Sequence, residues 1–280
     1  MTGPDTARAV PGPGTAERPG RTFDVLVTDL DGTLLDAEGV LRERTVRVLR
    51  ALAAAGVRIV FATARPAASA RAVLAPAAGL GAVLVSSNGA VAGDLDGDRP
   101  YWVRGMPSST VRAVVARLEA GAAWAVDREG DRLLGPGWPD VLAAGPLVER
   151  SVAGPPAAAD PEPALCLMVT GGPADAAALC RPQDAVVWTS SQPGLLEFSA
   201  AGADKVSALS DVLVRLGRTW QDVLAFGDSL NDAGMLAAAG RGVAMANACP
   251  EVRAAADAVA GHHAADGVAV WLEEQCPTPI

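Results

Sequence analysis

Runs of apolar residues that end in polar residues or glycine recur along the chain and predict buried strands. Three of them, at 23–27, 57–63 and 82–89, alternate with helical periodicity at 43–55 and 66–75. Unbroken apolar runs of this kind are typical of strands that are covered on both faces. The order strand, helix, strand, helix, strand indicates a doubly wound parallel sheet.

The pattern changes after residue 90. Residues 91–188 contain several turns, short alternating strands such as 164–170, and helical stretches at 108–120 and 173–180, which together predict an inserted α+β domain. The alternation of helix and strand then returns, with helices at 203–216, 233–239 and 267–274, a strand running into an acidic loop over 223–232, and a short strand at 242–245. We therefore expect an α/β protein with a Rossmann-like core.

The predicted boundaries follow from these changes in composition. Residues 1–20 are dense in Pro and Gly and are expected to form a disordered tail. Residues 21–90 and 189–280 are assigned to the core domain, and residues 91–188 to the inserted cap.

Composition and charge exclude several classes of protein. The net charge of −9 argues against nucleic-acid binding, which needs a basic surface. The four Cys form no CxxC pair and there are only two His, so a zinc site and a disulfide framework are not expected. No apolar run is long enough for a membrane helix, and the N-terminal residues lack the apolar segment of a signal peptide. We expect a cytoplasmic protein that does not bind membranes.

Polar side chains follow three of the predicted strands. Asp29 and Asp31 follow the first, Thr63 the second, and Asp228 with Asp232 the strand that begins at Val223. Ligands bind beyond the carboxyl ends of strands in open parallel sheets, so these groups are expected to meet. Carboxylates at one edge repel each other unless a cation lies between them, and oxygen ligands favour Mg²⁺.

The chain contains a single lysine, Lys205, against 22 arginines. Where a basic residue needs only to be basic, this sequence uses Arg. Because Lys and Arg differ in shape and in the geometry of their donors, the exception at Lys205 suggests a functional requirement.

Together these motifs resemble those of haloacid dehalogenase superfamily phosphatases. The matching segments are DLDGT (29–33), Thr63 after a strand, Lys205 at the start of a helix, and GDSLND (227–232). Three further segments resemble the Cof-type branch with a type IIB cap: SNGA (87–90), EFSAAGADK (197–205) and VAMANA (243–248).

The resemblance implies a covalent mechanism. Asp29 is expected to be the nucleophile that forms an aspartyl-phosphate, and Asp31 the general acid and base. It further implies that Mg²⁺ is held by Asp29, by the backbone carbonyl of Asp31 and by Asp228. Asp232 is expected either to bind the metal or to hold one of its ligands.

Four other residues receive roles from the same resemblance. Thr63 and Lys205 are expected to bind the transferring phosphoryl group. Asn88 is placed near the phosphate or the hinge of the cap, and Arg65 either binds substrate or forms a structural ion pair. The second motif of the family often has Gly where this chain has Ala64, which is tolerable only if the backbone angles there are ordinary.

Two segments imitate functional motifs. DLDGD (94–98) follows no buried strand and is interpreted as a hairpin turn of the cap. His262 and His263 are interpreted as a solvated loop.

The sequence therefore predicts a Mg²⁺-dependent phosphatase that acts on a small phosphomonoester such as a sugar phosphate. A phosphomutase shares the same covalent step and remains an alternative. A phospho-acceptor signalling protein also combines an acidic cluster with Thr and Lys. It would lack the insertion of about 100 residues and an acid/base Asp two residues after the acceptor. A binding protein with an inactive site is the remaining alternative.

Overall fold

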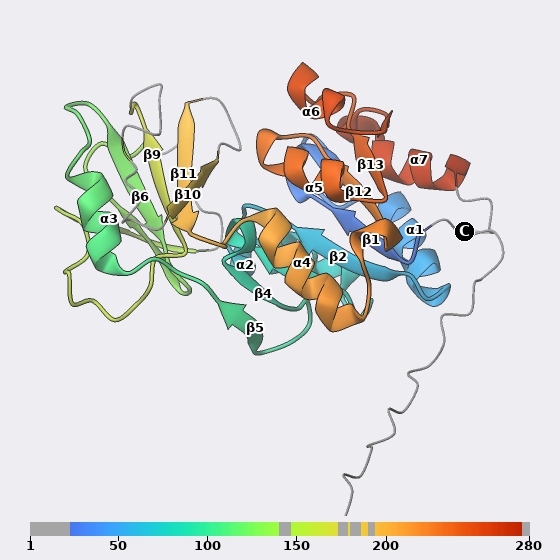
Figure 1. Cartoon of the computed structure of the whole chain (residues 1–280), viewed down its shortest axis with the longest axis horizontal. Coiled ribbons are helices and arrows are strands. Elements are labelled where there is room, and N and C mark those ends of the chain that lie inside the picture. The colour runs from blue at the N-terminus through green and yellow to red at the C-terminus, as the bar shows by residue number, and fades with distance from the viewer. Residues whose placement is uncertain (1–22, 140–146, 173–178, 180–185, 190–193, 276–280) are drawn as a thin grey trace, which may run out of the picture.

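The computed structural model describes residues 23–139, 147–172, 179, 186–189 and 194–275. The chain forms two lobes, each built on its own β-sheet (Figure 1). The N-terminal tail expected at 1–20 lies outside the described residues. So does most of the helix expected at 173–180.

The larger lobe is an eight-stranded sheet in the order β14-β13-β12-β1-β2-β3-β4-β5. The strands β14 to β3 of that order pair in parallel, whereas β4 and β5 add an antiparallel edge. Its strands are β1 (Val25–Thr28), β2 (Arg58–Ala62), β3 (Val83–Ser86), β4 (Val91–Asp94), β5 (Pro100–Val103), β12 (Val223–Gly227), β13 (Arg241–Ala244) and β14 (Ala258–Val259).

Helices cover both faces of this sheet. One face packs against α1, α2 and α7, and the other against α4, α5 and α6. The helices are α1 (Glu43–Ala54), α2 (Ala67–Val73), α4 (Lys205–Leu216), α5 (Ala233–Ala238), α6 (Pro250–Ala254) and α7 (Gly267–Gln275). Successive residues of β1 point to opposite faces, so Leu26 joins the first layer whereas Val25 and Val27 join the second. The predicted doubly wound α/β core is confirmed.

The smaller lobe is the cap, a six-stranded sheet in the order β10-β11-β9-β6-β7-β8. Its elements are α3 (Ser108–Val115), β6 (Ala123–Asp127), β7 (Asp131–Leu134), β8 (Val148–Ser151), β9 (Cys166–Thr170), β10 (Val186–Thr189) and β11 (Leu195–Ala200). Helix α3 packs on one face through Val111 and Val114, which contact Trp124 and Phe198 of the sheet.

Sheet membership moves both predicted boundaries of the cap. β4 and β5 pair with the core strand β3, although they fall within 91–188. β11 pairs with β9 of the cap, although it falls after residue 188. The partner of a strand decides its sheet, and the local sequence does not reveal that partner. The DLDGD segment at 94–98 is a hairpin turn as predicted, but it joins β4 to β5 of the core.

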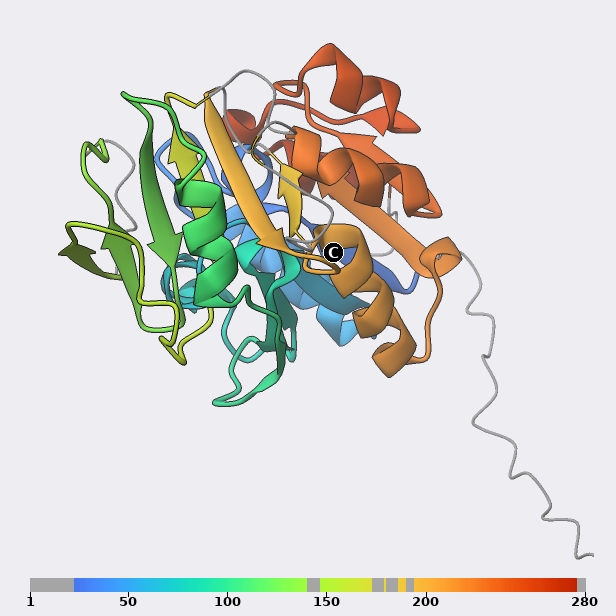
Figure 2. The same ribbon diagram turned by 60° about the vertical axis from the view of Figure 1, so that its left-hand side comes forward.

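Two chain crossings link the lobes and lie next to each other. The first crossing is at 104–107 and the second at 201–204, where β11 leads directly into α4 (Figure 2). The Arg104 guanidinium donates to the carbonyl of Gly202 over 3.2 Å and so ties the two crossings together. Among the described helices, none is both long and apolar enough to cross a membrane.

Candidate active site

The candidate site lies at the carboxyl ends of β1, β2 and β12, as the sequence predicts. β1 is followed by a turn over Leu30–Leu34, within which Asp31 and Gly32 have non-helical backbone angles. Gly32 has a φ of 73°, and a Cβ there would collide with the carboxylate of Asp228. Glycine is therefore required both for the left-handed backbone and for the close approach of the two loops.

Lys205 lies at the centre of the cluster. Its side chain is 1% exposed, and Nζ donates to Asp29 Oδ1 and to Asp232 Oδ1, each over 2.7 Å. Burial alone would lower the pKa of Lys205, but the charges of Asp232 and Asp29 outweigh that effect and raise the pKa. The ammonium therefore remains protonated between Asp29 and Asp232.

The cluster carries more negative than positive charge. Oxygens of Asp29, Asp228 and Asp232 lie within 4.8 Å of one another, with Lys205 as the cation among them. Burial raises the pKa of Asp29 well above its usual value, and the neighbouring carboxylates Asp232 and Asp228 raise it further, while Lys205 lowers it. Burial also raises the pKa of Asp228, and Asp232 adds to the effect. A set of oxygen donors with an excess of negative charge suits a hard divalent cation such as Mg²⁺.

The oxygens of Asp232 are already engaged. Oδ1 accepts from Lys205, whereas Oδ2 accepts the backbone N–H of Asp228 over 3.1 Å and that of Ser229 over 3.0 Å. Asp232 is fully buried. The carboxylate therefore orients both Lys205 and the turn that carries Asp228.

Asp31 and Arg65 form a bidentate ion pair. Arg65 Nε donates to Asp31 Oδ2 over 2.7 Å, and a terminal nitrogen donates to Oδ1 over 2.6 Å. Another terminal nitrogen of Arg65 donates to Ser69 over 3.2 Å. The Asp31 side chain is 54% exposed, so it faces the open side of the site. Of the two roles considered for Arg65, the geometry shows the ion pair, and its partner is the expected acid and base.

Thr63 is buried where β2 ends, and its hydroxyl accepts the backbone N–H of Arg65 over 3.1 Å. That bond leaves the hydroxyl proton of Thr63 available as a donor. Among the described non-glycine residues, positive φ occurs at Ser87, Asn88 and Asp266. Ala64 therefore has ordinary backbone angles, and the absence of glycine there costs nothing.

Asn88 belongs to a strained loop that reaches toward the cap. Ser87 and Asn88 have φ values of 48° and 55°, and Gly89 follows with 108°. A Cβ on Gly89 would collide with the backbone of Asp204, so only glycine lets this loop pack against the start of α4. Strain of this kind concentrates at functional sites.

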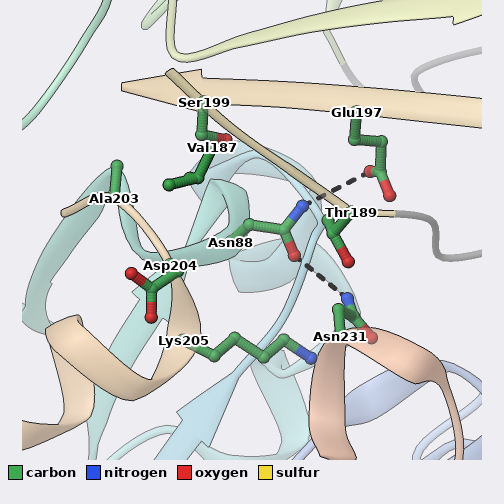
Figure 3. A pocket seen from close by; sticks show the side chains of 9 residues that line it. All are labelled: Asn88, Val187, Thr189, Glu197, Ser199, Ala203, Asp204, Lys205 and Asn231. Atoms are coloured by element: carbon green, nitrogen blue, oxygen red, sulfur yellow. Dashed lines mark hydrogen bonds between the residues drawn. The ribbon is translucent and has the colours of Figure 1, made fainter. Parts of the chain in front are cut away.

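A cavity of about 150 Å³ lies between the Asn88 loop, the start of α4 and the cap strands β10 and β11. Figure 3 shows Asn88 between two partners, donating to Glu197 over 3.4 Å and accepting from Asn231 over 3.0 Å. Lys205 also lines the cavity. The cavity therefore adjoins the acidic cluster through Lys205, which binds Asp29 and Asp232.

The comparisons with known proteins agree with this geometry. A family model described as haloacid dehalogenase-like hydrolase matches residues 26–123 and 177–272. The chain belongs to this family. The prediction of an enzyme of the phosphoric monoester hydrolase class is confirmed, because curated relatives that span most of the hydrolase are named phosphatases.

Two of these relatives carry the same name. The HMP-PP phosphatase of Klebsiella pneumoniae (strain 342) is 29% identical over 81% of this hydrolase and 85% of the relative. The HMP-PP phosphatase of Enterobacter sp. (strain 638) is 30% identical over 80% and 84%. The 5-amino-6-(5-phospho-D-ribitylamino)uracil phosphatase YcsE of Bacillus subtilis (strain 168) is 46% identical, but the match covers only 29% of this hydrolase and 32% of that relative.

Solved structures share the fold of the hydrolase, cap included. SMU.1108c from Streptococcus mutans UA159 covers 91% of the chain with a TM-score of 0.81 and 24% identity, and 100% of that structure is matched. The HAD subclass IIB sugar phosphatase BT4131 covers 90% of the chain and 98% of its own, with a TM-score of 0.72 and 22% identity. The family and the cap type expected from the sequence are confirmed.

The structure gives roles to two residues to which the sequence assigned none, Asn247 and His263. Asn247 Nδ2 donates to the carbonyl of Gly32 over 2.8 Å and to Asp228 Oδ2 over 3.3 Å. The backbone N–H of His263 donates to Asn247 Oδ1 over 3.2 Å and so holds the side chain that binds Asp228. The scarcity of Asn and the VAMANA segment were the available signals for Asn247. His263, interpreted as part of a solvated loop, instead supports the Asp228 loop.

Proposed function

We propose that the protein is a Mg²⁺-dependent phosphatase that hydrolyses a small phosphomonoester through an aspartyl-phosphate on Asp29. The observation that carries the proposal is a cluster of three residues. Lys205 binds the carboxylate of Asp29, and a carboxylate oxygen of Asp228 lies within 4.8 Å of one of Asp29. Such a cluster provides a nucleophile, a fixed cation and a place for a second one. The curated relatives named above are phosphatases, which supports the same reaction class.

The donors for the metal are the carboxylates of Asp29 and Asp228, together with the backbone carbonyl of Asp31. Bound Mg²⁺ would neutralise the phosphoryl oxygens and the repulsion between the carboxylates. Asp232 acts through Lys205 and the Asp228 turn, since its oxygens are already engaged there.

The first step transfers the phosphoryl group to the enzyme. A carboxylate oxygen of Asp29 attacks phosphorus, and the bond from phosphorus to the ester oxygen breaks. Asp31 donates its proton to the departing alkoxide. Lys205 and the hydroxyl of Thr63 donate to the phosphoryl oxygens, where charge builds up.

The second step releases phosphate. The Asp31 carboxylate takes a proton from water, the water oxygen attacks phosphorus, and the acyl-phosphate bond to Asp29 breaks. Arg65 holds both oxygens of Asp31 from the outer side, so we assign it as a positioning residue for both proton transfers. The small size of the cavity beside Lys205 suits a small leaving group.

The rival functions make different predictions in one assay. Purified protein is mixed with a panel of phosphomonoesters, with and without Mg²⁺, and released phosphate is measured over time. Steady turnover that requires Mg²⁺ and is lost in Asp29→Asn supports the proposal. Single-round labelling would instead indicate a signalling protein, and transfer to sugar without phosphate release a mutase.

A further inference from the structure

The cavity between the lobes contains polar atoms without partners. Ser199 is 2% exposed and lies on β11, yet its hydroxyl has no hydrogen-bond partner among the described residues. The same is true of Asn231 Oδ1, a buried atom at the opposite wall. Both residues line the cavity. Buried polar atoms are normally paired, so two such atoms around one cavity point to a ligand that pairs them.

Among the described residues, the wall also offers a carboxylate and a second hydroxyl that can accept hydrogen bonds. Glu197 contributes a buried carboxylate that Asn88 orients, and Thr189 adds a hydroxyl. Asp204 is occupied as the cap of α4, where it accepts from the backbone and the hydroxyl of Ser207. A ligand in the cavity therefore meets oxygen atoms that accept hydrogen bonds.

Positive charge is scarce in the same wall. Among the described residues that line the cavity, Lys205 is the one cation, and two carboxylates already bind it at 2.7 Å. Among these described lining residues, a carboxylate or second phosphate on the leaving group would meet the carboxylate of Glu197 and no cation other than Lys205. Juxtaposed like charges in a desolvated site cost several kcal/mol.

Resting on the proposed function, we infer that this cavity is the leaving-group subsite, and that Glu197 and Ser199 select phosphomonoesters whose leaving group donates hydrogen bonds. The substrate class is a small polyol or amino alcohol phosphate, and a second anionic group on the leaving group is excluded. With about 150 Å³, the cavity is smaller than the roughly 300–1,000 Å³ of pockets for drug-sized ligands.

The cap strand that reads the leaving group is joined directly to the catalytic lysine. Glu197 and Ser199 lie on β11, and the chain reaches Lys205 after a single short crossing. The short connection limits the distance between the cap residues Glu197 and Ser199 and the catalytic Lys205. A leaving group seated on β11 is thereby aligned with the phosphoryl group beside Lys205.

Matched pairs of esters test the inference. The first pair is a hexitol phosphate and the corresponding hexonate phosphate, and the second is glycerol phosphate and phosphoglycerate. Within each pair one hydroxymethyl group is replaced by a carboxylate. We expect kcat/KM to be roughly 100-fold higher for the polyol member, because the site rejects an unpaired anion. A generic aryl phosphate reports the chemical step independently of this choice.

Two variants locate the selectivity. Glu197→Gln removes the charge but keeps the shape, and should reduce the preference within each pair to about tenfold or less. Ser199→Ala should lower kcat/KM for the polyol esters about tenfold, the value of one good hydrogen bond in a dry site. It should leave the melting temperature unchanged, since the hydroxyl has no hydrogen-bond partner among the described residues. Glu129→Gln and Ser151→Ala, on exposed residues of the cap, are the matched controls.

The outcomes separate this inference from the proposed function. Failure to release phosphate from every ester, the aryl phosphate included, removes the proposed function and the inference with it. Turnover of the aryl phosphate with equal rates within the pairs, or with neither polyol accepted, overturns the inference alone. An unchanged preference in Glu197→Gln overturns the role of that residue.

Discussion

Replacement of Asp228 by Asn is expected to change the stability of the protein in opposite directions with and without Mg²⁺. Asp228 lies within 4.8 Å of Asp29 and Asp232, and burial together with Asp232 raises its pKa. Two unit charges at that distance repel by about 3.5 kcal/mol at an effective dielectric constant of about 20. Solvent screening at half-buried Asp228 and the opposing charge of Lys205 reduce the repulsion that Asp228→Asn would remove. The new amide would also pair less favourably with the side chain of Asn247 than the carboxylate does.

We therefore expect Asp228→Asn to raise the free energy of unfolding of the metal-free protein by about 1–2 kcal/mol. Mg²⁺ at about 100 times its dissociation constant should stabilise the unmutated protein by about 2.7 kcal/mol. The Asp228→Asn variant lacks one proposed carboxylate ligand of Mg²⁺, so Mg²⁺ should stabilise it little. The order of stability should therefore reverse when Mg²⁺ is added.

Urea unfolding at neutral pH, with a chelator and then with Mg²⁺, measures both states. Asp98→Asn, on the exposed β4–β5 turn, removes the same charge without touching the cluster and should stay within about 0.5 kcal/mol of the unmutated protein. An Asp228→Asn variant that is less stable than the unmutated protein in the chelator would refute the reasoning, because the carboxylates would then not repel.

Three further predictions concern catalysis. Asp29→Asn should abolish turnover and covalent labelling, whereas Asp31→Asn should accumulate phosphoenzyme from an aryl phosphate. Mass spectrometry of the labelled peptide checks both, and a label on Asp31 would contradict the assignment. Lys205→Arg should lower kcat/KM at least about tenfold and cost about 1–3 kcal/mol of stability, since the buried site has no room for a guanidinium; kinetics and unfolding equal to those of the unmutated protein would exclude this role. Arg65→Lys should slow alkyl phosphates more than aryl phosphates, because poor leaving groups depend more on the acid that Arg65 orients; equal losses on both would show a general structural defect.

The parallel strands of the core were predictable because they are covered on both faces. Apart from one residue at an end of each strand, β1, β2, β3 and β12 are apolar throughout, and such runs can be recognised without knowing which strands they pair with. β5 is different: it is a short edge strand with no fully buried side chain, so its hydrophobic pattern carries little information. β14, with two residues, is too short to leave a pattern at all.

The candidate site divides in the same way. Asp29, Thr63 and Asp228 follow strands of one parallel sheet, so the topology alone brings them together. Asn247 lies in a loop whose approach to Gly32 depends on tertiary packing. The pairing of Asp31 with Arg65 likewise depends on the angle at which the chain leaves β2. The sequence could name both residues of that pair but not their contact.

The adjacency of the two crossings makes the cap an exchangeable module. Arg104 binds Gly202 across the two crossings, so the points where an inserted segment leaves and re-enters the core lie close together. This spacing does not depend on the size of the insert. Recombination between relatives can therefore replace everything between the crossings without reopening the parallel sheet. Such an exchange would, however, remove Glu197 and leave Asn88 behind. A hydrolase with a transplanted cap would keep the chemistry of its core and take its leaving-group selectivity from the new cap. The new cap would have to provide an acceptor for the side-chain amide of Asn88, in place of Glu197.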